Sequence, residues 1–128
     1  MVVLDTCVLI WWTLDAARLS SRAVRACRRA ESAKLVLSSI SIWEIGIKAK
    51  RGLLDLGTTL EDFVARLKST GSIEIVPVSE AIWMRNVTLP WEHRDPADRT
   101  IVATALERRA PIVTPDREIQ RFYKRTIW

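Results

Sequence analysis

The sequence LPWEHRDPADRTIVATAL, from Leu89 to Leu106, passes from a charged, turn-like segment directly into an apolar helix. Asp95 and Pro96 predict where this helix begins, because Asp is a favoured N-cap residue and Pro fits the first helical position. Asp98 then lies in the first turn, where unpaired N–H groups and the helix dipole favour an ionised carboxylate. We therefore predict that Asp95 caps the helix. Asp98 is a candidate for a functional site, with a simple dipole interaction as its alternative.

Short apolar strands alternate with helical patterns on both sides of this segment. The predicted strands are Met1–Asp5, Leu35–Ser38, Ile73–Val76, Pro111–Thr114 and Thr126–Trp128. The predicted helices are Thr6–Leu14, Ser20–Ala33, Ser41–Arg51, one capped by Thr58 or Thr59 that ends near Ser69, Ser79–Arg85, Asp95–Arg109 and Arg117–Tyr123. This alternation, without repeats or linkers, favours one α/β domain over residues 1–128, in which helices cover both faces of a parallel sheet.

Composition narrows the class of protein. The chain has 128 residues, of which 48% are hydrophobic, and this is enough for one core. No apolar run approaches the ~18 residues of a membrane helix, and the N-terminus lacks the basic region of a secretory signal, so we expect a cytoplasmic protein with no membrane partner. Cys7 and Cys27 lack metal-site spacing and are predicted to be small buried side chains. The net charge of +5 fits a polyanion partner or an ordinary charged surface.

Four acidic residues from distant segments are predicted to meet at one edge of the sheet. Asp5 ends the first strand, Glu44 lies in the helix after the second, Asp98 opens a helix, and Asp116 follows the fourth strand. Functional sites in open parallel sheets lie at the carboxyl ends of the strands. Clustered carboxylates repel one another unless they are protonated or bind a cation, and Mg²⁺ or Mn²⁺ prefers oxygen ligands. Two such ions, roughly 4 Å apart, can activate a water for phosphodiester cleavage without a protein nucleophile.

Each of these acids also has a structural interpretation to weigh. Ser41 and Glu44 match a capping box, and Lys48 lies at the spacing of a helix ion pair with Glu44. Asp116 fits a turn as well as a site. Asp5 is harder to explain structurally, because a charge at the end of a buried strand is costly without a partner.

Four stretches in this order carry a family resemblance: VVLDT, SSISIWEIGIKAKRGLL, LPWEHRDPADRTIVATAL and IVTPD. Together they resemble PIN-domain ribonucleases, and specifically the VapC-type toxins of type II toxin–antitoxin pairs. The resemblance implies a three-layer α/β/α sandwich with a central parallel sheet, a Mg²⁺ or Mn²⁺ site and endonucleolytic cleavage of RNA. It places catalytic, metal-binding acids at Asp5, Glu44 and Asp98, with Asp116 at the position of a more variable fourth acid. It also implies a homodimer and a cognate VapB-like antitoxin.

The chain departs from the family pattern at two positions. Cys7 stands where relatives in this branch often carry His, and Ala97 stands where many carry Phe. Neither change removes one of the acids, so the nuclease hypothesis stands. The alternative hypothesis is a catalytically silent PIN-fold module that binds RNA or protein, and the retention of all four acids argues against it. An aspartyl phosphotransferase of the haloacid-dehalogenase type is excluded, because its pattern needs a second Asp at the position of Cys7.

The remaining polar candidates have open roles. Thr6 either caps a helix or contacts a metal-bound water or an acid. His93 is expected to be a surface group or a neighbour of the acids rather than a general base. Arg94 and Arg99 are expected to bind phosphate or to neutralise the carboxylates. The target, whether tRNA, rRNA or mRNA, depends on contacts that spacing does not reveal.

Six tryptophans form the other group of interest. Trp43 and Trp83 stand among apolar helix positions and are predicted to lie in the core. Trp11 and Trp12 are adjacent, so on a helix they point about 100° apart, and one of them is expected to be exposed to a partner.

Overall fold

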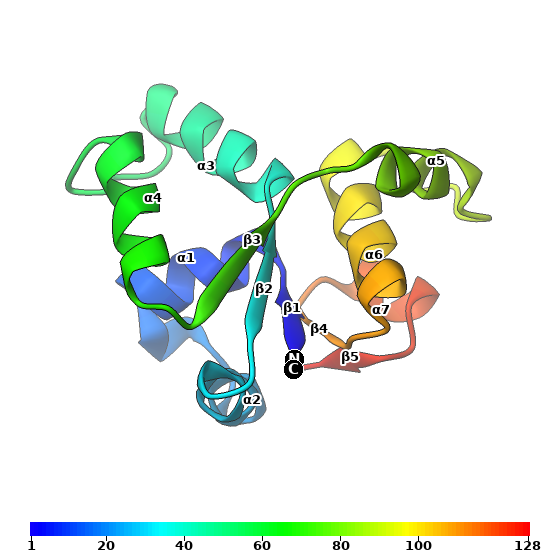
Figure 1. Ribbon diagram of the computed structural model, residues 1–128, viewed down its shortest axis with the longest axis horizontal. Helices are drawn as coiled ribbons and strands as arrows, with labels where there is room; N and C mark the ends of the chain where they lie inside the picture. The colour runs from blue at the N-terminus through cyan, green and yellow to red at the C-terminus, as the bar shows by residue number, and fades with distance from the viewer.

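The computed structural model describes residues 1–128 and contains five strands and seven α-helices (Figure 1). The strands are β1 (Val2–Leu4), β2 (Leu35–Ser38), β3 (Ile73–Val76), β4 (Ile112–Val113) and β5 (Thr126–Ile127). The helices are α1 (Thr6–Leu14), α2 (Ser21–Glu31), α3 (Ile40–Lys50), α4 (Leu60–Ser69), α5 (Glu80–Thr88), α6 (Pro96–Arg108) and α7 (Arg117–Phe122). A short 3₁₀ turn at Ala16–Arg18, which was not predicted, joins α1 to α2.

All strand pairs are parallel, and the strand order is β3-β2-β1-β4-β5. The central strand β1 pairs with β2 through Val3 and Val36 and with β4 through Val3 and Ile112. Figure 1 shows α1, α2 and α4 on one side of the sheet and α5, α6 and α7 on the other. The predicted three-layer α/β/α sandwich with a central parallel sheet is therefore confirmed.

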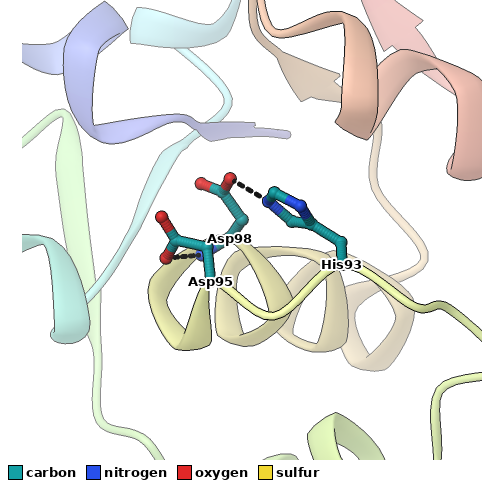
Figure 2. Close-up of side chains that lie close together, drawn as sticks. All are labelled: His93, Asp95 and Asp98. Atoms are coloured by element: carbon teal, nitrogen blue, oxygen red, sulfur yellow. Dashed lines mark hydrogen bonds and ion pairs between the residues drawn. The ribbon is translucent and has the colours of Figure 1, made fainter.

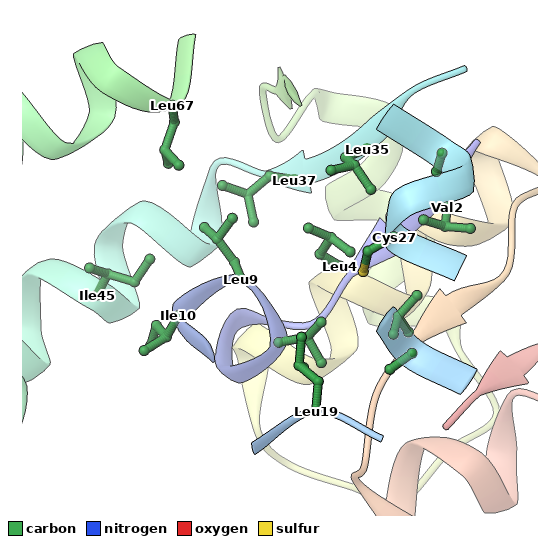
Figure 3. Close-up of a cluster of buried hydrophobic side chains, with 14 of the residues drawn as sticks. Val2, Leu4, Leu9, Ile10, Leu19, Cys27, Leu35, Leu37, Ile45 and Leu67 are labelled. Carbon is green, nitrogen blue, oxygen red and sulfur yellow. The ribbon is translucent and has the colours of Figure 1, made fainter. Parts of the chain in front are cut away.

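Alternation along β1 explains why the strand is apolar throughout. Val2 and Leu4 belong to the hydrophobic cluster on the side of α1, α2 and α4, whereas Val3 belongs to the cluster on the side of α5, α6 and α7. Figure 3 shows the first cluster, in which Leu4 and Leu37 from the sheet lie among helical side chains. A strand covered on both faces has no position for a polar side chain until it ends, and β1 ends immediately before Asp5.

Four helices begin at a side-chain cap, as predicted for Thr58 or Thr59 and for Asp95. The side chains of Ser20, Thr59, Ser79 and Asp95 each accept a hydrogen bond from a backbone N–H in the first turn of the following helix. The cap of α4 is thus Thr59 rather than Thr58. Helix α5 extends three residues beyond the predicted end, to Thr88.

The prediction that Trp43 and Trp83 lie in the core is wrong: they are 58% and 44% exposed. Helix α3 buries Ser41 and Ile45, which lie four residues apart on one face, so a residue midway between them points to the opposite side. Helix α5 likewise buries only one face, at Ile82 and Asn86. Apolar sequence neighbours did not reveal that each helix packs along a narrow stripe.

The predictions for Trp11 and Trp12 and for the two cysteines are met only in part. Trp11 and Trp12 are both half-buried, and Trp11 packs against Trp128 at a centroid distance of 5.9 Å. Cys27 is buried as predicted, whereas Cys7 is half-buried. None of the helices combines the length and the apolar character that a bilayer-spanning segment requires.

Candidate active site

The four predicted acids lie together in one cleft of about 290 Å³ at the carboxyl end of the sheet. Asp5 follows β1, Glu44 lies in α3, Asp98 lies in the first turn of α6, and Asp116 follows β4. The rest of the lining consists of Thr6, Cys7, Lys48, Asp95 and Pro115. The expectation that distant segments bring these carboxylates to one edge is therefore correct as geometry.

Asp5 is the most buried of the four, with 6% of its surface exposed. Burial raises the pKa of its carboxyl group, and the charge of Asp116 adds to this, while hydrogen bonds from Thr114 and from the backbone of Thr6 oppose the rise. The Thr114 hydroxyl donates to Asp5 Oδ2 at 2.6 Å and also accepts from the Asp116 backbone N–H at 3.0 Å. Thr114 thus ties the two acids to the end of β4.

Glu44 is held by the first residue of α1. The Thr6 hydroxyl donates to Glu44 Oε1 at 2.5 Å and lies 2.8 Å from the Ser41 hydroxyl. Burial raises the pKa of Glu44, and the nearby charges of Asp5 and Asp95 act in the same direction. Of the two open roles of Thr6, the structure supports contact with an acid.

The capping-box interpretation of Glu44 is wrong. Helix α3 begins at Ile40, one residue before the predicted start, so Ser41 is inside the helix and fully buried. The Glu44 side chain points to Thr6 rather than back to the helix N-terminus. Lys48 lines the same cleft but forms no ion pair with Glu44, so the helix ion pair is also absent.

Asp95 and Asp98 have different roles at the start of α6: Asp95 caps the helix, and Asp98 lies in the cleft. Asp95 caps α6, since its Oδ1 accepts from the N–H groups of Ala97 at 2.9 Å and Asp98 at 3.2 Å. The Asp98 side chain instead lies against His93, with Oδ2 2.7 Å from His93 Nε2 (Figure 2). Burial raises the pKa of Asp98 to about 7, and the charges of Asp95, Asp5 and Asp116 contribute, against the hydrogen bond from His93.

Asp116 serves the structural role that was proposed as its alternative while also lining the cleft. Its Oδ1 accepts from the backbone N–H groups of Glu118 at 2.8 Å and Ile119 at 3.2 Å, which caps α7. The carboxylate still faces the cleft beside Asp5. The two interpretations of Asp116 are therefore compatible.

Arg99 does neither of the things expected of it. Its guanidinium donates to the backbone carbonyls of Asn86, Leu89, Trp91 and His93, and so faces the loop before α6 rather than the carboxylates. A guanidinium directed at four carbonyls is not free to bind phosphate. Its proximity to Asp98 in sequence was misleading because adjacent helical residues point about 100° apart. Arg94 is exposed and makes no hydrogen bond.

Two structural partners were missed at the sequence level. Ser41 was assigned to a cap rather than to the Thr6 hydroxyl, and Arg99 was not recognised as the anchor of the loop. A hydroxyl among apolar residues in a helix was a usable signal for Ser41, because buried hydroxyls need a partner. No local signal identified the four carbonyls that Arg99 contacts.

The chemistry of the cleft follows from its donor set. Three carboxyl groups with raised pKa values in one cleft are a costly arrangement that a divalent cation relieves. One ligand atom from each of His93, Asp95 and Asp98 lies within 4.8 Å of the others, so an imidazole lies beside the carboxylates although His93 does not line the cleft itself. The Cys7 thiol has a raised pKa because it is buried beside Asp5, so it stays protonated and is not a nucleophile at neutral pH.

Comparison with known proteins places this arrangement in a family. The model of the PIN domain matches residues 2–125. Ribonuclease VapC22 of Mycobacterium tuberculosis is 31% identical over 120 residues, which cover 93% of this chain and 89% of that protein.

Two solved structures have the same fold. VapBC2 from Rickettsia felis bound to a promoter DNA fragment has a TM-score of 0.70 at 15% identity, with all of both chains covered. A toxin–antitoxin complex from Klebsiella pneumoniae has a TM-score of 0.66 at 21% identity and covers 100% of this chain and 97% of that one. The match to the family model over nearly the whole length and the identity to a curated relative show that this chain belongs to the PIN domain family.

Proposed function

We propose that this chain is a metal-dependent endoribonuclease toxin that cleaves RNA phosphodiester bonds and is neutralised by a cognate antitoxin. The observation that carries the proposal is the convergence of Asp5, Glu44, Asp98 and Asp116 in one cleft, with raised pKa values at the first three. Similarity to a protein named as a ribonuclease supports RNA as the substrate. Similarity to toxin–antitoxin complexes supports a VapB-like antitoxin as the partner.

The donor set suits Mg²⁺ or Mn²⁺. Asp5, Glu44 and Asp98 would hold the cation and Asp116 would assist, because carboxylate oxygens are the ligands that these ions prefer. When bound, the cation supplies positive charge at the scissile phosphate and lowers the pKa of water. Thr6 and Thr114 keep the Glu44 and Asp5 carboxylates facing the cleft. Asp98, whose raised pKa of about 7 lies near neutrality, would hold the cation in its ionised form.

Cleavage of a mixed RNA pool with Mg²⁺, with Mn²⁺ and with EDTA tests the proposal. We expect cleavage only with metal, and its loss in Asp98→Asn. Glu92→Gln is the matched control, because Glu92 is an exposed acid in the loop before α6 and makes no side-chain hydrogen bond. The absence of both cleavage and Mn²⁺ binding in a calorimetric titration would favour the silent RNA- or protein-binding module. Cleavage that persists in EDTA would refute the metal requirement.

We also propose that the protein is a homodimer through the outward faces of α3 and α5. Trp43 on α3 and Trp83, Met84 and Val87 on α5 are large exposed apolar side chains. The two helices begin side by side, since the Val78 N–H donates to the Ser39 hydroxyl. Apolar surface of this kind is typical of an interface.

Light scattering is expected to give twice the 14.6 kDa monomer mass, and Trp83→Glu with Val87→Glu is expected to give the monomer. Leu14→Glu, at an exposed leucine that ends α1, serves as the control and should leave the dimer intact. A monomeric parent protein at micromolar concentration would contradict the proposed dimer.

A further inference from the structure

A second hollow, larger than the acidic cleft, lies between α2 and the sheet, around the start of β1 and along β5. It has a volume of about 530 Å³ and is formed by α2, the start of β1 and β5. Its floor is apolar and includes Val2, Ala30 and Ile127. Figure 1 shows α2 beside both chain termini, away from the ends of α3 and α6 that frame the cleft. Nothing in the nuclease chemistry uses this region.

Three arginines form the rim of the hollow. Arg22, Arg25 and Arg29 lie three and four residues apart, so they share one side of α2. All three are exposed, and none belongs to an ion pair. The only acid in α2 is Glu31. The rim therefore carries three positive charges that no neighbouring carboxylate neutralises.

We propose that this hollow is an RNA-binding exosite, in which the rim arginines bind backbone phosphates and the apolar floor takes up a ribose or base. The inference rests on the proposed ribonuclease function. Guanidinium groups bind phosphate through paired N–H donors, and their planar faces also stack on bases without regard to sequence. Arg22 and Arg29 are separated by about 10 Å along the helix axis, so the rim fits an extended strand better than a single phosphate.

The distance between the hollow and the acidic cleft determines which RNA molecules can contact both. Val2 begins β1 and Asp5 follows its end, so one strand of about 10 Å separates the floor of the hollow from the carboxylates. A di- or trinucleotide bound at the carboxylates is too short to fill the hollow as well. An RNA that is long or folded contacts both. The exosite therefore selects for large RNA substrates through affinity, without reading bases.

The test measures binding of fluorescent oligouridylate, either long or about three nucleotides in length, by anisotropy in EDTA and in the Asp5→Asn background. The rim variant combines the substitutions Arg22→Gln, Arg25→Gln and Arg29→Gln in one protein. We expect roughly tenfold weaker binding of the long RNA, and a salt dependence reduced by about 2 in slope, since each single-strand phosphate contact contributes about 0.7. In the active background, cleavage of the short RNA is expected to be unchanged.

The matched control removes an equal number of positive charges outside the hollow. It combines Arg28→Gln in α2 with Arg66→Gln and Lys68→Gln in α4. These side chains are exposed and do not line the hollow. We expect less than a twofold effect on long RNA. An equal loss in both triple variants would overturn the exosite in favour of diffuse charge. Unchanged binding of long RNA by the rim variant would overturn the exosite as well.

Two further readouts separate the possible failures. If the parent cleaves short RNA but does not bind long RNA more tightly, the exosite fails and the nuclease stands. If the parent cleaves no RNA with either metal, the nuclease fails, and the binding data still decide whether the rim holds RNA. Thermal unfolding establishes that the rim variant is folded; otherwise the single changes Arg25→Gln and Arg28→Gln provide the same comparison.

Discussion

Asp5→Asn is expected to lower metal-dependent RNA cleavage more than about 100-fold, because a carboxylate that holds the cation is lost. In EDTA the same substitution is expected to raise the melting temperature. Asp5 is buried with a raised pKa, so its ionised form destabilises the folded cation-free protein. Asparagine has nearly the same shape and retains an oxygen that accepts from the Thr114 hydroxyl. Activity and stability should therefore change in opposite directions.

The pH dependence of the stability gain has a definite sign. An acid whose pKa is higher in the folded than in the unfolded state binds more protons when folded, so the free energy of unfolding falls as pH rises between the two values. Above the folded pKa the penalty is complete, and below the unfolded pKa, about 4, it is absent. The melting temperature of Asp5→Asn should exceed that of the parent more at pH 8 than at pH 4.

Thermal melts in EDTA and in Mg²⁺, at both pH values, measure this effect. In Mg²⁺ the parent gains stability by mass action and the variant gains less, so the difference in melting temperature shrinks or reverses. Asp15→Asn is the control, because Asp15 is exposed and its side chain caps nothing. A variant that is inactive and also less stable in EDTA would indicate that Asp5 is a structural residue. Full cleavage by the variant would remove Asp5 from the site.

The fold was accessible from local patterns because each signal has a short-range cause. Apolar triplets such as Val2–Leu4 cannot form amphipathic helices, and the cap residues before α2, α4 and α6 satisfy N–H groups only three residues away. A parallel sheet then places the residues after its strands at one edge. Asp5 and Asp116 were predictable in position for this reason. Glu44 needed the family resemblance, because its local context equally matched a cap.

The rest depended on contacts between distant segments. The exposure of Trp43 and Trp83 depends on which stripe of each helix meets the sheet, and an apolar neighbourhood in sequence does not define that stripe. The Thr6–Ser41 hydrogen bond joins residues 35 positions apart. The rim arginines of α2 were noticed only as part of a helix, because the hollow beneath them is completed by β1 and β5.

Arg99→Ala is expected to lower the free energy of unfolding by about 2–4 kcal/mol, because hydrogen bonds to a charged donor are worth more than neutral ones and their loss leaves carbonyls unpaired. The guanidinium donates to the carbonyls of Asn86 in α5 and of Leu89, Trp91 and His93 in the loop between α5 and α6. Chemical denaturation measures the change. Arg94→Ala, in the same loop but exposed and without hydrogen bonds, should stay within about 0.5 kcal/mol of the parent.

The loop that Arg99 anchors also carries a contact to the acidic cleft. Trp91 stacks on Phe122 of α7 at 4.8 Å, and the next anchored residue, His93, bonds to Asp98. Arg99 is thus a positioning residue: it fixes the loop, and the loop fixes the imidazole against the carboxylate. Loss of such a supporting contact typically costs about 10–100-fold in metal affinity or activity. We expect the Mg²⁺ concentration for half-maximal cleavage to rise in Arg99→Ala at a temperature where the variant is folded.

Arg99→Lys separates positioning from charge. Lysine keeps the positive charge but has one ammonium group in place of the planar fork, so it cannot reach carbonyls on both sides of the loop. If charge alone mattered, lysine would restore both stability and the Mg²⁺ midpoint. The fork geometry instead predicts that stability recovers partly while the midpoint stays close to that of Arg99→Ala. A normal Mg²⁺ midpoint in a destabilised Arg99→Ala would limit Arg99 to a structural role and would detach the His93–Asp98 contact from metal binding.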